Sequence, residues 1–259
     1  MVDPYKKSGL RDTLESLVVT VILAVFGTTF VVQAFKIPTG SMEDTLLIGD
    51  HLLVNKFAFA AHAPALDHLL PYQQVRRDDV VVFKYPYDDQ TQEPGEYFVK
   101  RVIAVPGDRV KLVHRQVFVN GQRVEEPFVN YGSPPDPPQP TDDFPPPDGD
   151  EYLTPRWSAE ISKYVDQDGE LVAPPGKYFV MGDHRERSWD GRFWGLVPRE
   201  LISGRPLLIY WSFETPQGEY SRTSLADRLS QTVDLIVHFI PKTRWRRTFK
   251  FVRDRKSVV

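Results

Sequence analysis

YFVKRVIAV, residues 97–105, is the most apolar strand-like run of the chain beyond residue 36. β-Branched and aromatic residues dominate it, which predicts a β-strand. Two cations, Lys100 and Arg101, stand in its middle. Either Lys100 sits among apolar neighbours, or the two cations form a solvated pair at a strand edge, as strand lysines usually do. The pattern by itself leaves both interpretations open.

Other short runs on either side of residues 97–105 share this composition. They are His51–Phe59, Val80–Tyr85, Val110–Val113, Val117–Val119, Lys177–Met181 and Pro206–Phe213. Asn120-Gly121 directly follows one of them and is typical of a tight hairpin turn. No long helical repeat appears between residues 36 and 220. We therefore expect a mainly β fold: an antiparallel β-sheet core with an inserted smaller β/loop lobe.

Two segments interrupt the strand pattern. Residues 131–155 are rich in proline and acidic residues, which excludes a central strand and predicts a surface excursion. Residues 58–72 are apolar but broken by proline. They are too short to span a bilayer, so they either rest on a lipid surface or form a covered loop.

The N-terminal region contains an uncharged run, Ser16–Phe35, of about the length that a helix needs to cross a bilayer. Lys6, Lys7 and Arg11 precede it and predict a cytoplasmic N-terminus, with the chain after Lys36 exported. A cleaved signal peptide is the competing interpretation, but the apolar run is long for one and no small-x-small site clearly follows. We therefore expect one N-terminal transmembrane helix that is retained.

These patterns divide the chain into five parts. We expect a cytoplasmic N-terminus at 1–13 and a transmembrane anchor at 14–35. A catalytic β core at 36–111 and 177–241 would enclose an inserted proline-rich lobe at 112–176. Residues 242–259 mix basic and aromatic side chains, which suits anionic lipid headgroups better than nucleic acid in an exported domain.

The amino-acid composition limits the kinds of chemistry that the protein can carry out. The 259 residues include no cysteine, which excludes disulfides, thiol nucleophiles and thiolate metal sites. The histidines lack any metal-binding spacing, so we expect neither a metal nor another cofactor. A net charge of −3 gives no attraction to nucleic acid.

A candidate nucleophile follows the apolar run directly. Ser41 lies in Ile37-Pro38-Thr39-Gly40-Ser41-Met42, where proline and glycine predict a turn that can present a hydroxyl. Serine needs a base, and the chain has no GxSxG elbow and no histidine in a suitable setting. A lysine can serve if desolvation lowers its pKa from about 10.4 to near neutrality, at a cost of about 4 kcal/mol to the charged form.

Three ordered blocks resemble the bacterial signal peptidase I family, which are Ser-Lys proteases. They are IPTGSMEDTLLIGDHLLVNKF at 37–57, YFVKRVIAVPGDRV at 97–110 and GDHRERSWDGRFWGLVP at 182–198. With the predicted anchor they cover roughly three tenths of the chain, and their order makes the signature specific.

The resemblance implies a role for each matching residue. Ser41 corresponds to the nucleophile and Lys100 to the general base; Thr39, with the backbone N–H of Ser41, corresponds to the oxyanion hole, and Ser188 to a serine that hydrogen-bonds the lysine. The implied structural network is Asp183, Arg185, Asp190 and Arg192, and the implied substrate-binding positions are Ile37, Met42, Leu46 and Val99.

The resemblance also implies the setting. The substrates would be signal peptides of exported preproteins, cut after a small-x-small motif. The protein would lie in the bacterial plasma (inner) membrane with a single pass, an extracytoplasmic catalytic domain, and the lipid bilayer as its other partner, with no nucleic acid and no metal.

The third block departs from the family pattern at His184, Glu186, Arg187 and Gly191, and Asp44 replaces a usual proline. None of these positions is a nucleophile, base or oxyanion donor, so we expect only the bracing hydrogen bonds to differ. Two other functions remain: a Ser-Lys self-cleaving repressor, which needs a DNA-binding domain in place of the anchor, and a membrane-tethered β binding module without catalysis.

Overall fold

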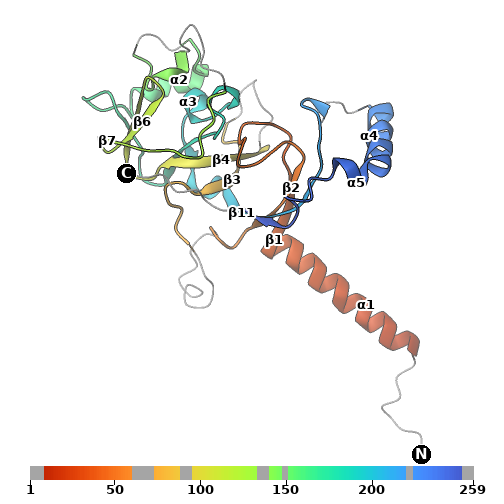
Figure 1. Ribbon diagram of the computed structural model, residues 1–259. Helices are drawn as coiled ribbons and strands as arrows, with labels where there is room; N and C mark the ends of the chain where they lie inside the picture. The colour runs from red at the N-terminus through yellow and green to blue at the C-terminus, as the bar shows by residue number, and fades with distance from the viewer. Residues whose placement is uncertain are drawn as a thin grey trace, which may run out of the picture.

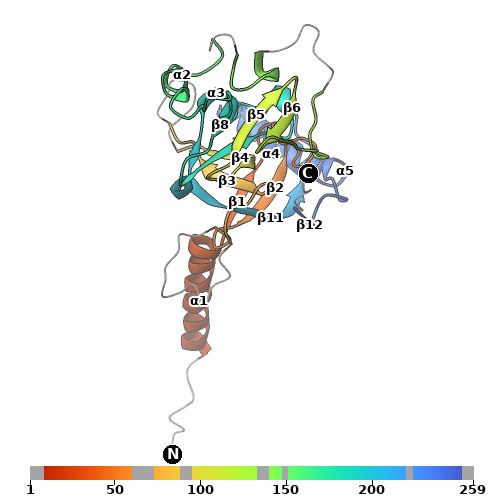
Figure 2. The same cartoon turned by 90° about the vertical axis from the view of Figure 1, so that its left-hand side faces the viewer.

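The computed structural model describes residues 9–59, 73–87, 95–132, 140–147, 151–219 and 224–252. One helix, α1 (Gly9–Phe26), stands apart from a body of β-strands. In Figure 2 this helix points straight down from β1 (Val32–Lys36), and the β body lies above it.

An eight-stranded sheet forms the larger part of the body (Figure 1). Its order is β1, β2 (Asp50–Asn55), β11 (Ile202–Ser212), β3 (Val80–Lys84), β4 (Tyr97–Ala104), β9 (Lys177–Met181) and β10 (Val197–Pro198), with β12 (Lys250–Phe251) paired to β11. Every pair in it is antiparallel. The expected antiparallel, mainly β fold is confirmed.

A second, four-stranded sheet has the order β7 (Gln122–Arg123), β6 (Gln116–Val119), β5 (Arg109–Val113) and β8 (Leu171–Val172). The predicted hairpin turn lies between β6 and β7, where Asn120 and Gly121 have φ angles of 53° and 75°. The change from one sheet to the other comes before Arg109. Our boundary between residues 111 and 112 therefore falls inside β5.

Short helices connect these strands. They are α2 (Pro155–Ile161), α3 (Gly191–Trp194), α4 (Leu225–Val237) and α5 (Phe239–Lys242). α4 lies within residues 177–241, which we expected to belong to the β core. Ser224 caps its N-terminus by accepting a hydrogen bond from the backbone N–H of Asp227, and leucines and valines then recur at helical spacing. The division expected at 177–241 therefore differs from the structure.

The N-terminal segment also differs from the expected anchor at 14–35. α1 begins at Gly9 and ends at Phe26, a π-helical turn covers Gly27–Val31, and Val32–Lys36 pairs with β2 as strand β1. Within the described ranges, no helix has the length and apolar character needed to span a membrane. Backbone pairing with β2 explains why the last four residues of the apolar run form a strand.

The predicted surface features are only partly visible. Residues 60–72, most of the segment proposed to rest on lipid, lie outside the described residues, as does much of the proline-rich excursion. The visible part of that excursion packs inward at one point, because Phe144 is buried and stacks on Phe179 with ring centroids 5.0 Å apart.

A buried ion pair joins the C-terminal segment to the body. Asp50, at the start of β2, is completely buried. Arg247 donates to both of its carboxylate oxygens, at 3.2 and 2.5 Å, and also to the backbone carbonyl of Thr45 at 3.1 Å. Arg244 Nη1 lies farther from Asp50, at 4.0 Å. Arg247 is therefore the main counter-charge of a carboxylate that has no access to water.

Replacing Arg247 with methionine is expected to lower the free energy of unfolding by roughly 3 kcal/mol, because it leaves a buried carboxylate without its partner. Urea denaturation of the full chain in detergent measures this change. Arg246→Met is the control, because Arg246 is exposed and should change stability by no more than about 0.5 kcal/mol. Equal effects of the two substitutions would contradict the buried-pair account.

Candidate active site

The loop between β1 and β2 carries Ser41. Its two ends are tied together by hydrogen bonds from Ile37 N to Asp50 O and from Gly49 N to Ile37 O, both at 2.9 Å. Gly49 has a φ of +88°, and a Cβ atom there would lie 1.9 Å from the carbonyl oxygen of Phe213. This closure fixes the loop on the sheet and leaves Ser41 6% exposed at its far end.

Lys100 approaches Ser41 from β4. Its Nζ lies 2.7 Å from Ser41 Oγ, within hydrogen-bond distance. Lys100 is 4% exposed, and Arg101 is 0% exposed. The alternative of a solvated cation pair at a strand edge is therefore wrong. Consecutive strand residues point to opposite faces, and both faces of β4 are covered here.

Burial lowers the pKa of Lys100 from 10.5 to about 8, because the ammonium loses its hydration. The nearby carboxylates of Asp190 and Asp183 act in the opposite direction, while Arg192 adds to the lowering. The Phe98 ring, with its centroid 5.6 Å from Nζ, is part of the apolar surroundings. Desolvation thus brings the pKa of this amine closer to neutral pH, where the unprotonated form can accept a proton.

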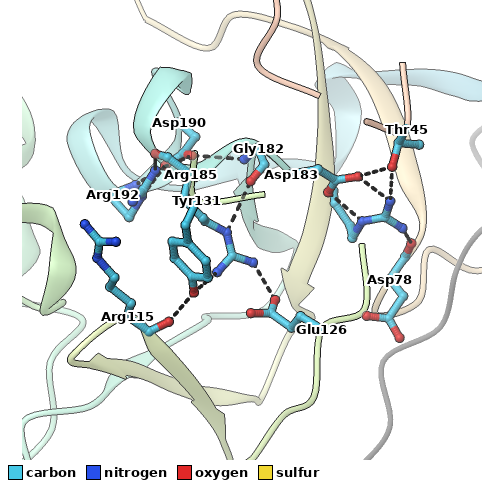
Figure 3. A network of polar contacts seen from close by, with 11 residues as sticks. Thr45, Asp78, Arg115, Glu126, Tyr131, Gly182, Asp183, Arg185, Asp190 and Arg192 are labelled. Carbon is cyan, nitrogen blue, oxygen red and sulfur yellow. Dashed lines mark hydrogen bonds and ion pairs between the residues drawn. The ribbon is translucent and has the colours of Figure 1, made fainter. Parts of the chain in front are cut away.

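On the opposite face of β4, Arg101 binds Asp183, which belongs to the third sequence block, residues 182–198. It donates to both oxygens of Asp183, at 2.8 and 2.5 Å, and to the carbonyl of Asp78 at 2.8 Å. Thr45, from the loop that carries Ser41, donates to the same carboxylate at 2.5 Å. Asp183 therefore links the strand of Lys100 to the loop of Ser41. Figure 3 shows Thr45 and Asp78 on one side of Asp183.

The remaining charged residues of the block form a second buried cluster (Figure 3). Arg192 Nε and Nη2 contact Asp190 at 2.9 and 3.0 Å, and Asp190 also accepts from the backbone N–H of Gly182 at 2.9 Å. Arg185 pairs with Glu126 at 2.5 Å and donates to Gly182 O at 3.2 Å. The structure thus brings all four predicted network residues together around Gly182, in two clusters.

Gly182 lies close to the backbone of Ser41. A Cβ atom on it would lie 2.2 Å from Ser188 Oγ and 2.5 Å from the carbonyl oxygen of Ser41. Two residues further on, His184 N donates to that carbonyl oxygen at 3.1 Å. Only glycine fits at position 182 without moving the backbone of Ser41.

Ser188 lies beside this contact, and it is 4% exposed. Its Oγ has no hydrogen-bond partner among the described residues. The hydrogen bond that we expected between Ser188 and Lys100 is therefore absent from the structure. The two residues share the buried region, but Lys100 Nζ is directed to Ser41.

Known proteins resemble this chain along most of its length. The family model described as "Signal peptidase, peptidase S26" matches residues 10–211. The chain belongs to the signal peptidase S26 family.

Signal peptidase I of Pseudomonas aeruginosa is 36% identical over 203 residues, which cover 73% of this chain and 68% of that protein. Signal peptidase I of Aquifex aeolicus is 32% identical over 240 residues, covering 80% and 86%. A crystal structure of a signal peptidase I from Enterococcus faecalis covers 51% of this chain and 97% of that chain, at 23% identity and a TM-score of 0.34. Membership and these relatives make the chain a serine endopeptidase of the signal peptidase I type.

A groove of about 180 Å³ runs past the peptidase's Ser41 and Lys100. Of the predicted substrate-binding residues, Ile37, Met42 and Val99 line it, and so does Thr39. Leu46 does not line it; this leucine is fully buried in the apolar cluster beneath. Sequence reasoning did not identify the other lining residues, which are Phe35, Lys36, Pro38, Glu96, Tyr97, Phe98, Arg187 and Trp189.

The departures from the family pattern have their own contacts. Glu186 pairs with Arg115 at 3.2 Å, and Arg187 lies 3.6 Å from Glu43. Gly191 sits so close to Val180 O that a Cβ atom would lie 2.8 Å from it. Asp44 accepts from Asn130 at 3.4 Å. These departures therefore take part in contacts around the site.

Residues without a predicted role complete the site. Thr45 and Arg101 lie within the first and second blocks, whereas Glu126 and Tyr131 lie outside all three, where Arg185 donates to Glu126 Oε1 and, at 3.4 Å, to the Tyr131 hydroxyl. The one sequence signal for a role of Arg101 is that a charged residue is unusual beside Lys100 in an apolar strand. Glu126 lies 59 positions before its partner Arg185, and no local pattern joins them.

No group of three or more acidic or histidine side chains that could hold a metal ion occurs in the part of the peptidase that the structure describes. A larger cavity, about 580 Å³, lies between α4 and the end of β11, and only Lys36 lines both it and the groove.

Gly182→Ala is expected to reduce kcat for peptide cleavage by about 100-fold, because the added methyl group displaces Ser41 relative to Lys100. Steady-state kinetics on a signal-peptide substrate measure this. Gly27→Ala is the matched control, since a Cβ atom there meets nothing within 4 Å. Wild-type kcat in Gly182→Ala would show that the block does not pack against Ser41 as described.

Proposed function

We propose that this chain is a membrane-tethered Ser-Lys endopeptidase that removes signal peptides from exported preproteins after a small-x-small motif. The observation that carries the proposal is the 2.7 Å separation of Ser41 Oγ and Lys100 Nζ, with the lysine buried. An exposed lysine would be an ammonium at neutral pH and would not accept a proton.

In the proposed mechanism, neutral Lys100 accepts the hydroxyl proton of Ser41 as Oγ bonds to the scissile carbonyl carbon. The resulting Lys100 ammonium then protonates the leaving amine as the C–N bond breaks, which leaves an ester on Ser41. A water molecule attacks this ester while Lys100 again takes the proton. The acid is released, and both side chains return to their starting state.

The negative charge that develops on the carbonyl oxygen needs hydrogen-bond donors. We assign this role to the Thr39 hydroxyl and the backbone N–H of Ser41, since Thr39 lines the same groove as Ser41. One such donor typically contributes about 3–4 kcal/mol to the transition state. Thr39→Val would remove the hydroxyl while keeping the shape of the side chain.

Ser188, Asp183, Arg185, Asp190 and Arg192 have supporting roles in this proposal. Burial lowers the pKa of Lys100 to about 8, which costs the folded protein roughly 3 kcal/mol near neutral pH relative to a solvated lysine. Buried ion pairs with good geometry resist relaxation of the pocket. We assign to these ion pairs the role of excluding water from Lys100.

The groove accommodates an extended peptide. Ile37, Met42 and Val99 give it apolar walls, and its volume of about 180 Å³ is small. Small side chains such as alanine fit such shallow pockets, whereas larger ones clash. We therefore propose Ile37, Met42 and Val99 as the residues that select small side chains before the cut, with buried Leu46 supporting Met42 from within the same cluster.

Membrane tethering is supported by the surface of α1. Its apolar side chains are more than half exposed along much of the helix; Leu14, Leu17, Ile22 and Leu23 are 59–64% exposed. Water disfavours such a surface, and lipid does not. β1 starts six positions after α1 ends and leads directly into the Ser41 loop. We propose a single-pass protein of the bacterial plasma membrane, with residues 1–13 cytoplasmic and the β body outside.

Incubation of the full chain with a preprotein bearing Ala-x-Ala should yield a product whose new N-terminus directly follows that motif. Ser41→Ala and Lys100→Met should each abolish cleavage without unfolding the protein, because each removes one partner of the proton transfer. N-terminal sequencing of the product and circular dichroism of the variants measure the two results. Ser224→Ala is the control for serine loss, since it caps α4 far from the groove. Cleavage by Ser41→Ala at the wild-type rate would exclude this mechanism.

The pH dependence follows from Lys100. Its pKa in the folded protein is about 8, and only the unprotonated amine is a base. We therefore expect kcat/KM to rise about tenfold per pH unit up to about pH 8 and then to level off. A plateau that begins only near pH 10 would mean that Lys100 is solvated, and it would contradict the buried-base mechanism.

A further inference from the structure

The C-terminal arm, residues 225–242, comprises α4 and α5 and lies beyond residues 10–211, the range that matches the family model. One stripe of its surface is strongly apolar and exposed. Leu225, Leu229, Val233, Ile236, Val237 and Ile240 are 51–85% exposed. The spacing of the first five places them on one side of α4, and Ile240 follows in α5.

The opposite side of α4 faces the β body. The half-buried positions are Asp227, Gln231, Asp234 and Leu235, again at helical spacing, and the last three line the large cavity beneath the helix. Gln231 Nε2 donates to Glu219 O at 3.0 Å. An amphipathic helix normally turns its apolar side to the core. Here the polar side faces the body and the apolar side faces outward.

Firm contacts hold the arm in this orientation. Glu214 N donates to Lys242 O at 2.8 Å, and Lys242 Nζ pairs with Asp234 at 2.7 Å. The ring of Phe239 lies 5.9 Å from that of Trp211 on β11. These contacts fix the orientation of the arm, so the exposed stripe is a defined part of the protein surface.

The surface beside the arm indicates what covers the stripe. Trp245, Phe249 and Phe251 are 56–72% exposed, and the exposed cations Arg246 and Lys250 lie between them in the sequence. Aromatic and basic side chains together suit the headgroup region of an anionic bilayer. In Figure 1, α1 and the arm both lie to the right of the β body, with α1 extending below the body and the arm level with its upper part.

We propose that the C-terminal arm is a second membrane contact, which lies in the plane of the anionic lipid surface with its apolar stripe buried among the acyl chains. The inference rests on the proposed function, since it takes α1 as the first contact. A second contact removes rotation of the β body about α1. The groove beside Ser41 then keeps a fixed height and direction relative to the membrane surface.

Single cysteines test this geometry, because the chain has none of its own. A polarity-sensitive fluorophore is attached at Leu229→Cys or Ile236→Cys in the full chain, reconstituted in vesicles of phosphatidylcholine and phosphatidylglycerol. Nitroxide-labelled lipids then report depth. We expect blue-shifted emission and strong quenching by a shallow nitroxide at both positions, to the same extent, as for a helix in the membrane plane.

Two further labels serve as controls. Ile22→Cys in α1 should be quenched best by a deep nitroxide, and Arg123→Cys on β7 should not be quenched. Absence of quenching at 229 and 236, with Ile22→Cys quenched, would overturn the second contact and leave the tether intact. Absence of quenching at Ile22→Cys would instead refute the tether itself. A blue shift without quenching that depends on protein concentration would mean that a second copy covers the stripe, and it too would overturn the proposal.

Activity gives an independent test. Leu229→Glu combined with Ile236→Glu should reduce cleavage of a preprotein presented in the same vesicles by about tenfold, with unchanged cleavage of a short soluble peptide in detergent. Gln116→Glu combined with Gln122→Glu adds the same charge at exposed positions of the second sheet and should change neither rate. Equal loss on both substrates would mean that the arm supports folding instead of membrane contact.

Discussion

The structure depends on one constraint: the side chain of Lys100 is buried away from water. Lys100 is 4% exposed and lies 2.7 Å from the hydroxyl of Ser41. Burial of its amine disfavours the ammonium, which is costly for folding and useful for proton transfer. The rest of the fold keeps that amine dry and keeps the serine beside it.

Three chain segments far apart in sequence meet to do this. β4 supplies Lys100 and Arg101, the loop between β1 and β2 supplies Ser41 and Thr45, and the block after β9 supplies Asp183. The Asp183 carboxylate accepts from both of the other segments, so it fixes their spacing. The C-terminal segment adds a further support, since Arg247 contacts both Asp50 and the carbonyl of Thr45. Residues beyond the range matched by the family model therefore brace the nucleophile loop.

Sequence patterns predicted the strands well where both faces of the strand are buried. β3, β4 and β9 lie within one residue of the expected ranges, because continuous apolar runs of β-branched residues have few other structures available. β1 was missed because Val32–Lys36 continues the apolar run of α1, and composition alone cannot locate the point where a helix gives way to a strand. α4 was not predicted, although Ser224 and the helical spacing of its leucines and valines are sequence signals for it; what the sequence does not contain is which side of the helix faces the body.

The features of the candidate site also fall into two groups, those that the sequence predicted and those that it did not. The resemblance of three short blocks was enough to single out Ser41, Lys100 and the four charged network residues, since each block keeps its residues in a fixed local order. The pairing of Arg185 with Glu126, the burial of Leu46 and the lack of a partner for Ser188 Oγ could not be inferred. They depend on which surfaces face each other after folding.

The sequence alone determined the family, the antiparallel β class and the two residues proposed to exchange a proton, because these follow from local composition and ordered motifs. Tertiary structure alone decided that Lys100 is dry, that Asp50 depends on Arg247, and that the stripe of α4 faces away from the body. Desolvation is the physical reason for the difference. It depends on every atom that surrounds a group, and those atoms come from parts of the chain that no local pattern connects.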